Sequence, residues 1–139
     1  MPIYPTPEEI MAEPAPQFTD DILSLMQDFK QHWRQHKNMT IGQKYDMLCS
    51  LLVYLNLTIF GNGHIGISIL EDAPTASYNP ETNVITLNNP SIISALHEFG
   101  HKVNGPNELL ACRFSVHLFK QTFPKAFARL HWEGHLLKK

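Results

Sequence analysis

The sequence lacks a long uninterrupted hydrophobic run. Its longest apolar stretch, residues 48–60, is interrupted by Ser50, Asn56 and Thr58, and it falls short of the roughly 18 residues that a membrane-spanning helix requires. The amino-terminal residues have neither the basic start nor the apolar run of a secretory signal peptide. We therefore expect a soluble protein that has no membrane partner.

Cysteine is also scarce, because the chain contains only 2. Cys49 and Cys112 both fall in segments with helical periodicity, and two cysteines cannot form a disulfide framework. These features favour a reducing compartment, so we expect a cytoplasmic protein. A nucleophilic role for Cys112 is disfavoured, since a cysteine on a helix face usually serves as inert packing.

The chain has no strong excess of one charge, because its formal net charge is −2 at pH 7. Acidic residues dominate residues 1–28, which contain no Lys or Arg, and basic residues dominate residues 113–139. The basic residues are spread out and have no aromatic stacking platform, so a nucleic-acid partner is not expected. Attraction between the acidic arm and the basic tail would allow self-association, and a solvated surface is the simpler alternative.

Length and composition predict one folded domain. With 139 residues, 43% of them hydrophobic, the chain can bury one core and is too short for two ordinary domains. Residues 1–18 are rich in Pro and Glu, which predicts an extended arm that is dispensable for folding. Residues 19–139 are predicted to form the domain. It would begin with two helices, the first capped by Thr19 or Asp20 and the second by a Thr40–Gln43 capping box.

The most informative motif is His97-Glu98-Phe99-Gly100-His101. It lies within residues 89–103, whose apolar side chains recur at helical spacing, with Asn89 predicted as the N-cap and Pro90 at the first helical position. Two histidines four positions apart on a helix lie about 40° from each other, so both imidazoles can reach one metal ion. The Asn-Gly-Pro sequence at residues 104–106 predicts the end of this helix.

This spacing is typical of a catalytic zinc site. Glu98 would lie beside the metal and take a proton from a water molecule, whose pKa the ion lowers to roughly 7. A catalytic zinc has three protein ligands, so one is required in addition to His97 and His101. Glu108 is the strongest candidate, because it is predicted in the first turn of a helix capped by Asn107 and can point back at the preceding helix. One zinc ion per chain is therefore expected.

These residues resemble the zincin-type metallopeptidases. Residues 108–115 have the pattern Glu-x-x-Ala-x-x-Phe-small, which is similar to the ImmA/IrrE-type peptidases and the minigluzincins. The resemblance covers about residues 76–124 and implies a small α+β, zincin-like domain with a short, largely antiparallel sheet and a zinc-binding helix pair. It also implies that Glu108 is the third zinc ligand and that the substrate is another protein.

A hairpin that runs along the active-site cleft is a further implication of the resemblance. Its strands are predicted at residues 76–78 and 83–87 around a turn at residues 79–82, and an alternating Ile pattern predicts a strand at residues 65–69 before them. An extended substrate is expected to add to the exposed edge of the hairpin. The residues predicted to pair with the substrate are Ala76, Ser77 and Tyr78.

Several side chains are candidates for stabilising the transition state. They are Tyr78, His117, His131 and His135. The last two are also four residues apart, but Gly134 weakens a helix there and Trp132 holds the position that a general base would need. A second metal site is therefore not expected.

The sequence thus predicts a zinc metalloendopeptidase that hydrolyses a protein or peptide substrate through an activated water. Two alternatives remain open. One is a zinc-stabilised binding or assembly module without catalysis, and the other is a metal-free interaction domain that docks through its proline-rich arm. Glu98 argues against the first alternative, since a structural zinc site needs no base and is usually closed by a fourth protein ligand.

Overall fold

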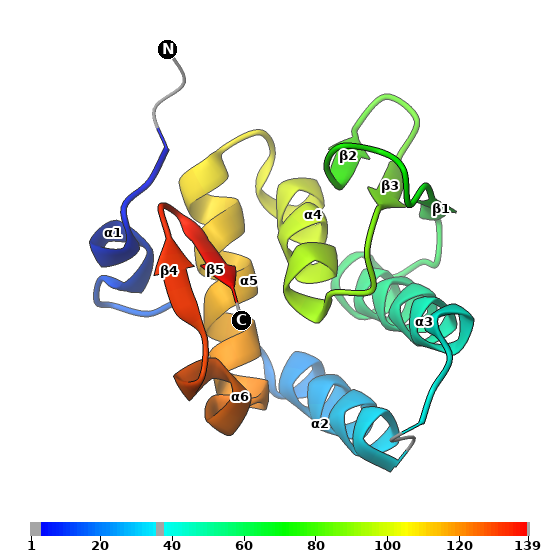
Figure 1. Cartoon of the computed structure of the whole chain (residues 1–139). Coiled ribbons are helices and arrows are strands. Elements are labelled where there is room, and N and C mark those ends of the chain that lie inside the picture. Colours follow the sequence, from blue (N-terminus) through cyan, green and yellow to red (C-terminus); the bar gives the residue numbers. More distant parts are fainter. Residues whose placement is uncertain (1–3, 36–37, 139) are drawn as a thin grey trace.

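The computed structural model describes residues 4–35 and 38–138. Residues 1–3 of the predicted arm and residues 36, 37 and 139 of the predicted domain lie outside the described part. The mixture of helices and short strands confirms the α+β prediction (Figure 1). The elements are α1 (Pro7–Met11), α2 (Asp20–Gln35), α3 (Ile41–Phe60), β1 (Gly66–Ile69), β2 (Ser77–Asn79), β3 (Val84–Leu87), α4 (Ile92–Asn104), α5 (Glu108–Thr122), α6 (Pro124–Ala128), β4 (His131–Glu133) and β5 (Leu136–Lys138).

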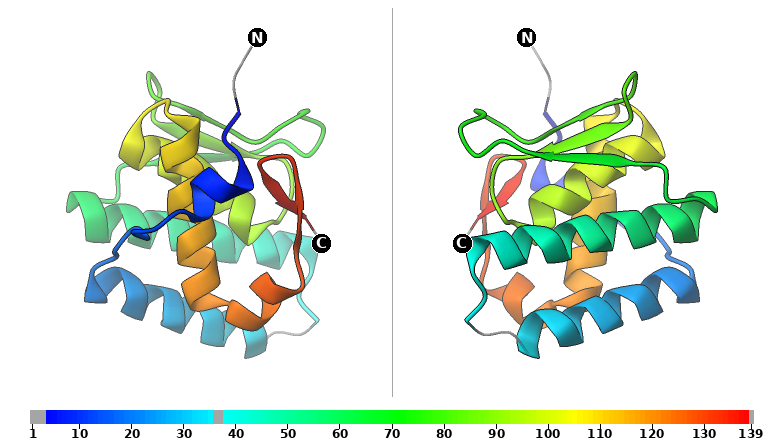
Figure 2. Two further views of the ribbon diagram at one scale, coloured as in Figure 1. Left: turned by 90° about the vertical axis from the view of Figure 1, so that its left-hand side faces the viewer. Right: turned by 90° about the vertical axis from the view of Figure 1, so that its right-hand side faces the viewer.

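The two helices predicted at the start of the domain are α2 and α3. The Thr19 hydroxyl accepts a hydrogen bond from the Ile22 amide at the start of α2. The predicted capping box of α3 is confirmed, with 3.1 Å from Gln43 N to Thr40 Oγ1 and 2.9 Å from Thr40 N to Gln43 Oε1. Figure 2 shows α3 lying between α2 and the three-stranded sheet. Among the described residues, no helix is both long and apolar enough to cross a membrane.

The predicted hairpin and the strand before it form one sheet, in the order β1-β3-β2. β2 and β3 pair antiparallel, with Tyr78 opposite Ile85, whereas β1 and β3 pair parallel, with Gly66 opposite Val84. A Cβ atom at Gly66 would lie 2.9 Å from Val84 Cγ2, so the parallel pair needs a glycine there. This order leaves β2 at one edge of the sheet.

The hydrophobic core lies between α2, α3, the sheet, α4 and α5. Each element contributes side chains at the spacing of its own secondary structure, every third or fourth residue on the helices and every second residue on β3. The sheet thereby holds α4 from one side and α5 holds it from the other. The fully buried contributors are Met26, Leu48, Leu52, Leu55, Ile85, Leu87, Ala95, Leu96, Phe99 and Leu118.

The motif helix α4 begins slightly later than the sequence predicted. Ser91, rather than Asn89, is the N-cap, and its hydroxyl accepts a hydrogen bond from the Ser94 amide at 3.2 Å. Asn89 instead accepts a hydrogen bond from the Ser91 amide at 3.0 Å, so Pro90 precedes the helix. The predicted end of the helix is confirmed, because Gly105 caps it with a φ of 77°, in the left-handed region that favours glycine.

α4 and α5 pack closely at Gly100, inside the motif. A Cβ atom added at Gly100 would lie 3.0 Å from the carbonyl oxygen of Ala111 and 3.1 Å from its Cα atom. A side chain at Gly100 would therefore require α5 to shift by a few tenths of an ångström, so the glycine favours close packing of α5 against the turns of α4 that carry His97 and His101.

The amino-terminal segment departs from the prediction of an extended arm. Residues 7–11 form α1, and Ile10 is fully buried against α5. The Arg113 guanidinium on α5 donates hydrogen bonds to the main-chain carbonyl oxygens of this segment. The acceptors belong to Glu9, Ile10, Ala12 and Pro14. The segment is therefore part of the packed structure, because a buried apolar side chain and main-chain hydrogen bonds fix it.

The described chain ends in a hairpin made of β4 and β5, which follows the short helix α6. Leu137 on β5 and Trp132 on β4 pack with Ile10 and Val116 in a small apolar cluster. α1 and the terminal hairpin therefore both pack on α5, and Figures 1 and 2 show them side by side along this helix.

Candidate metal centre

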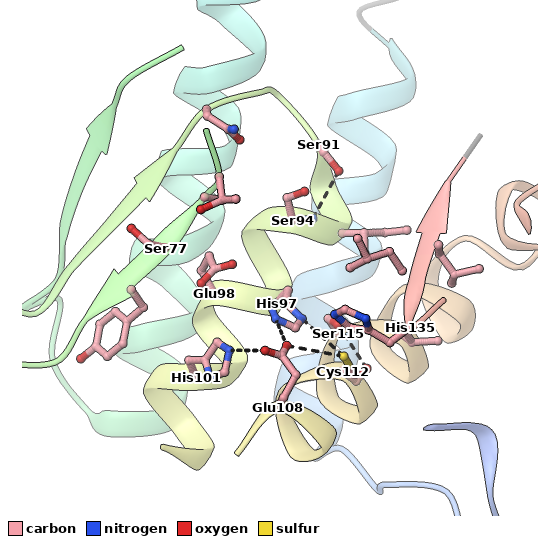
Figure 3. Close-up of a pocket in the computed structure, with 18 of the residues that line it drawn as sticks. Ser77, Ser91, Ser94, His97, Glu98, His101, Glu108, Cys112, Ser115 and His135 are labelled. Carbon is pink, nitrogen blue, oxygen red and sulfur yellow. Dashed lines mark hydrogen bonds and ion pairs between the residues drawn. The ribbon is translucent and has the colours of Figure 1, made fainter. Parts of the chain in front are cut away.

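A cleft of about 820 Å³ opens over the histidine motif (Figure 3). One wall consists of β2 and the residues before it, and the opposite wall consists of β5 and the turn before it, with α4 and the start of α5 between them. This volume lies within the roughly 300–1,000 Å³ that is typical of ligand sites. The titratable side chains at the centre of the lining are His97, Glu98, His101, Glu108 and Cys112.

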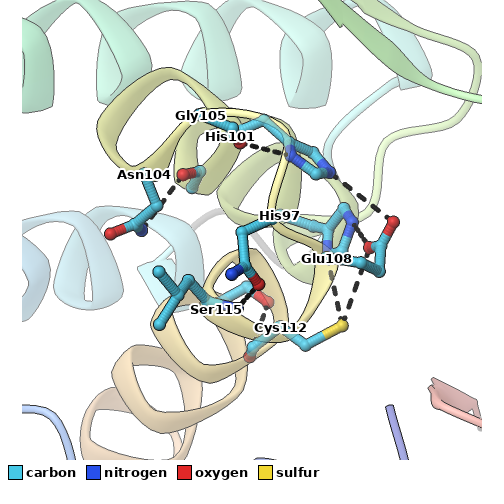
Figure 4. Close-up of polar contacts among 10 residues, drawn as sticks. His97, His101, Asn104, Gly105, Glu108, Cys112 and Ser115 are labelled. Atoms are coloured by element: carbon cyan, nitrogen blue, oxygen red, sulfur yellow. Dashed lines mark hydrogen bonds and ion pairs between the residues drawn. The ribbon is translucent and has the colours of Figure 1, made fainter. Parts of the chain in front are cut away.

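Glu108 is the first residue of α5 because Asn107 caps that helix, as predicted, by accepting a hydrogen bond from the Leu110 amide at 3.0 Å. From this position its carboxylate reaches both imidazoles of α4 (Figure 4). Glu108 Oε1 lies 2.5 Å from His97 Nε2, and Oε2 lies 3.7 Å from His101 Nε2. The two imidazole rings are 5.0 Å apart and nearly perpendicular, at 84°. The Glu108 carboxylate therefore contacts both predicted histidine ligands, one through each oxygen.

The protonation of His101 follows from its contact with Gly105. His101 Nδ1 lies 2.9 Å from the Gly105 carbonyl oxygen, which can only accept, so Nδ1 carries the proton. A proton held on Nδ1 leaves Nε2, which lies 3.7 Å from Glu108 Oε2, as the nitrogen that can offer a lone pair to a metal. A cation between the two atoms would stabilise this arrangement. A carbonyl partner for the remote nitrogen is also usual for a metal-binding histidine.

The spacing of these atoms fits a small tetrahedral ion. Zn–N and Zn–O distances of about 2.0 Å imply about 3.3 Å between neighbouring ligand atoms. The observed 2.5 Å and 3.7 Å from Glu108 to the two histidines lie on either side of that value. The ligand atoms of His97, Glu108 and Cys112 already lie within 4.8 Å of one another, whereas His101 is not part of this compact group and would have to move closer to bind the same ion.

Cys112 is the residue at this site that sequence reasoning missed. It lies one turn after Glu108 on α5, and its Sγ atom is 3.8 Å from Glu108 Oε1 and 3.8 Å from His97 Nδ1 (Figure 4). His97, Glu108 and Cys112 together form a group that could hold a metal ion. The sequence signal that could have revealed Cys112 is its spacing of four from Glu108 on a predicted helix.

Glu98 lies in the same cleft and is only 8% exposed. Burial raises the pKa of its carboxyl from an ordinary 4.5 to about 7, and the Glu108 carboxylate adds to this rise while His101 opposes it. A carboxyl that titrates near neutral pH can accept a proton and release it again, which general acid–base catalysis requires. A cation at the site would favour the charged carboxylate and lower this pKa.

Two neighbours of Glu108, His97 and Cys112, also have shifted pKa values, and both shifts favour the uncharged form without a metal. Burial lowers the pKa of His97, and this effect outweighs the Glu108 carboxylate, which raises it. A neutral imidazole is the form that binds metals. Burial also raises the pKa of the Cys112 thiol to about 12, with a contribution from Glu108. The protonated thiol is a poor nucleophile, in agreement with the sequence analysis.

Two of the predicted transition-state stabilisers line the cleft. His135 lies in the turn before β5, and its ring stacks on Tyr4 with 4.4 Å between the ring centres and an angle of 6°. Tyr78 lies on the opposite wall, where its hydroxyl donates a hydrogen bond to Asn83 Oδ1 at 3.0 Å. The structure thus places His135 at the cleft, whereas the Tyr78 hydroxyl is already hydrogen-bonded to Asn83.

The remaining two predicted stabilisers are not brought to the cleft. His117 is buried on α5, and its Nε2 lies 2.9 Å from the carbonyl oxygen of Ile10, so it helps to hold α1. His131 is exposed on β4 and is not among the described residues that line the cleft. Neither residue is in a position to contact a substrate bound there.

Comparisons of this chain with models of protein families, with curated proteins and with solved structures found no match. The functional interpretation therefore depends on the cleft itself. Its distinguishing features are two histidines on one helix, a carboxylate that bridges them, a thiol beside them and a second, buried carboxyl.

Proposed function

We propose that this chain is a zinc-dependent endopeptidase that hydrolyses peptide bonds of a protein or peptide substrate. The observation that carries the proposal is the approach of the Glu108 carboxylate to both His97 and His101, with the buried carboxyl of Glu98 in the same cleft. The likeness of the motif to zincin-type metallopeptidases, and of residues 108–115 to the ImmA/IrrE-type and minigluzincin families, supports it.

His97 and His101 would bind the ion through Nε2, and Glu108 through its carboxylate, which leaves the fourth position to water or substrate. When bound, zinc would polarise the scissile carbonyl group and make a water molecule more acidic. In this arrangement the Nδ1–H group of His97 donates to the Cys112 sulfur, as the Nδ1–H group of His101 donates to the Gly105 carbonyl. With the ion bound, both histidines would then carry their proton on Nδ1, which is the tautomer that a metal requires at Nε2.

Glu98 is the general base in this proposal. Its carboxylate takes a proton from the attacking water and later delivers that proton to the leaving amine. Glu98 is largely buried and lines the cleft, so its carboxyl would be positioned to exchange this proton with the reacting atoms. His135, on the wall formed by the hairpin, is the remaining candidate for a donor that stabilises the negative charge of the transition state.

An extended segment of the substrate would add to the edge of β2, next to Ala76, Ser77 and Tyr78, all of which line the cleft. Main-chain pairing of this kind recognises an extended backbone more than a particular sequence. The free thiols of Cys49 and Cys112 suit a reducing compartment, which supports a cytoplasmic location.

Cys112 favours a second candidate function, a zinc-stabilised binding module without catalysis. If the thiol turned toward the ion, four protein side chains would fill the coordination sphere, as they do in structural zinc sites. Such a site would leave no position for the attacking water. Glu98 would then have no chemical role, although it would still occupy the cleft.

The test is cleavage of a defined peptide mixture. Zinc-loaded wild type is incubated with a library of peptides made by digesting a bacterial lysate, and new termini are identified by mass spectrometry. Glu98→Gln should keep the zinc and reduce cleavage by roughly 10² or more, because the amide cannot accept the proton. Glu133→Gln, which changes an exposed carboxylate outside the cleft, is the matched control. Cleavage by Glu98→Gln at the wild-type rate would exclude the proposed mechanism, and an uncut library would favour the binding module.

A further inference from the structure

The cleft lies between two strands, and each presents its edge to it. The lining includes three consecutive residues of the β5 strand, Leu136, Leu137 and Lys138, and three consecutive residues at β2. Side chains alternate between the two faces of a strand, so a strand that presented only a face would contribute every second residue. Consecutive lining residues therefore indicate an edge. Figure 3 shows the two strands on opposite sides of the motif helix.

The register of the terminal hairpin shows which main-chain groups of β5 are free. Glu133 pairs with Leu136 across the two-residue turn, and Trp132 pairs with Leu137. In a hairpin closed by two residues, the pair next to the turn exchanges both hydrogen bonds, and the next pair exchanges none. The N–H and C=O groups of Leu137 therefore point away from β4. Leu137 lines the cleft, so this free edge adjoins it.

Two contacts fix the position of this edge. The side chains of Leu137 and Trp132 pack on Ile10 and Val116, which anchors the hairpin to α1 and α5. The stacking of His135 on Tyr4 holds the turn. A fixed edge loses little conformational freedom when it pairs with a ligand, so it contributes more to affinity than a mobile segment would.

We propose that β5 is the second docking edge of the substrate cleft, and that an extended peptide lies between β2 and β5 with main-chain hydrogen bonds to Leu137. The proposal rests on the proposed function and deepens it, because it defines the substrate as an unfolded or extended segment whose two edges are both recognised. A helical segment satisfies its main-chain groups internally and does not pair with either edge.

The test compares two zinc-binding probes, acetohydroxamate and a tetra-alanine hydroxamate, on the zinc-loaded protein. The first binds only the metal, and the second adds an extended backbone. Leu137→Pro removes the outward N–H group at an edge position where proline is tolerated, and Leu137→Ala is the matched control that keeps this group. Leu137→Pro should bind the peptide hydroxamate about three- to tenfold more weakly than Leu137→Ala, as expected for one lost hydrogen bond. Both variants should bind acetohydroxamate equally.

Because proline at position 137 could disturb the hairpin itself, a second measurement uses the wild-type protein. In wild type, the Leu137 amide should exchange its hydrogen more slowly when the peptide hydroxamate is bound than when acetohydroxamate is bound. Peptide binding with unchanged exchange at Leu137 would overturn the role of β5 and leave the proposed metal site intact. Failure of both hydroxamates to bind the zinc-loaded protein would instead overturn the proposed function, and the role of β5 with it.

Discussion

The buried carboxyl of Glu98 makes the stability of the metal-free protein depend on pH in a defined direction. Its pKa is about 7 in the folded protein, compared with 4.5 for an ordinary glutamate. Between these values the folded protein binds more protons than the unfolded chain. The free energy of unfolding therefore falls as pH rises from about 4.5 to about 7, and the loss is complete above that window. One pKa unit corresponds to about 1.36 kcal/mol, so the rise from 4.5 to about 7 lowers the free energy of unfolding by about 3 kcal/mol in total.

His97 contributes with the opposite sign, because burial lowers its pKa below the ordinary 6.5. Its contribution to stability grows as pH rises toward 6.5, since protonation of the unfolded chain no longer competes with folding. The wild-type curve therefore mixes both effects, and Glu98→Gln separates them. The variant keeps His97 and replaces the titrating carboxyl by a neutral amide of similar size.

Urea unfolding of the metal-free wild type and of Glu98→Gln, at about pH 4.5 and about pH 8, measures the difference. Relative to wild type, Glu98→Gln should be about 3 kcal/mol more stable at the higher pH than it is at the lower pH. Saturating zinc should shrink this gap, because a nearby cation stabilises the charged carboxylate. If the difference in unfolding free energy between Glu98→Gln and wild type were the same at both pH values, the argument that the folded protein holds Glu98 away from water would be refuted.

Two further predictions concern the packing that builds the site. Gly100→Ala should weaken zinc binding by about tenfold or more by pushing α5 away from α4. Gly42→Ala, where the new Cβ would meet only Thr40 Oγ1 at 3.9 Å, should leave zinc titrations unchanged; equal effects would contradict the close-packing argument. Ile10→Ala should reduce the free energy of unfolding by about 2–5 kcal/mol, because this side chain is fully buried. Leu70→Ala, at a side chain that is 50% exposed, should change it by less than about 0.5 kcal/mol, and a similar loss in both variants would show that α1 is not part of the core.

The local features of the site could be predicted from the sequence. The spacing of His97 and His101, the glycine stop of α4 and the Asn107 cap that presents Glu108 all depend on residues within one or two helical turns of each other. Relations of this kind follow directly from the spacing of residues along the sequence. The α+β class followed from the same local patterns, and the structure confirms it.

The features that could not be predicted depend on contacts between distant segments. α1 is held by Arg113 and His117, which bind main-chain carbonyl oxygens near Ile10, and carbonyl oxygens are present at every residue. Composition alone therefore suggested an extended arm. The terminal hairpin could not be predicted for the same reason, because Trp132 and Leu137 hold it by packing on Ile10 and Val116, which are distant in the sequence. The place of Cys112 beside the predicted metal ligands could not be recognised from the sequence, because it depends on how α5 packs against the helix that carries His97.

X-ray absorption at the zinc edge of the zinc-loaded protein tests the central claim most directly, because it reports the kind and distance of the atoms around the ion. Ligation by His97, His101 and Glu108 predicts only nitrogen and oxygen neighbours at about 2.0–2.2 Å, with an imidazole signature from two rings. Cys112→Ser should give the same spectrum. A sulfur neighbour at about 2.3 Å in the wild type would contradict this ligand set and support a site closed by Cys112, and a protein that retains no zinc would contradict the proposed metal centre itself.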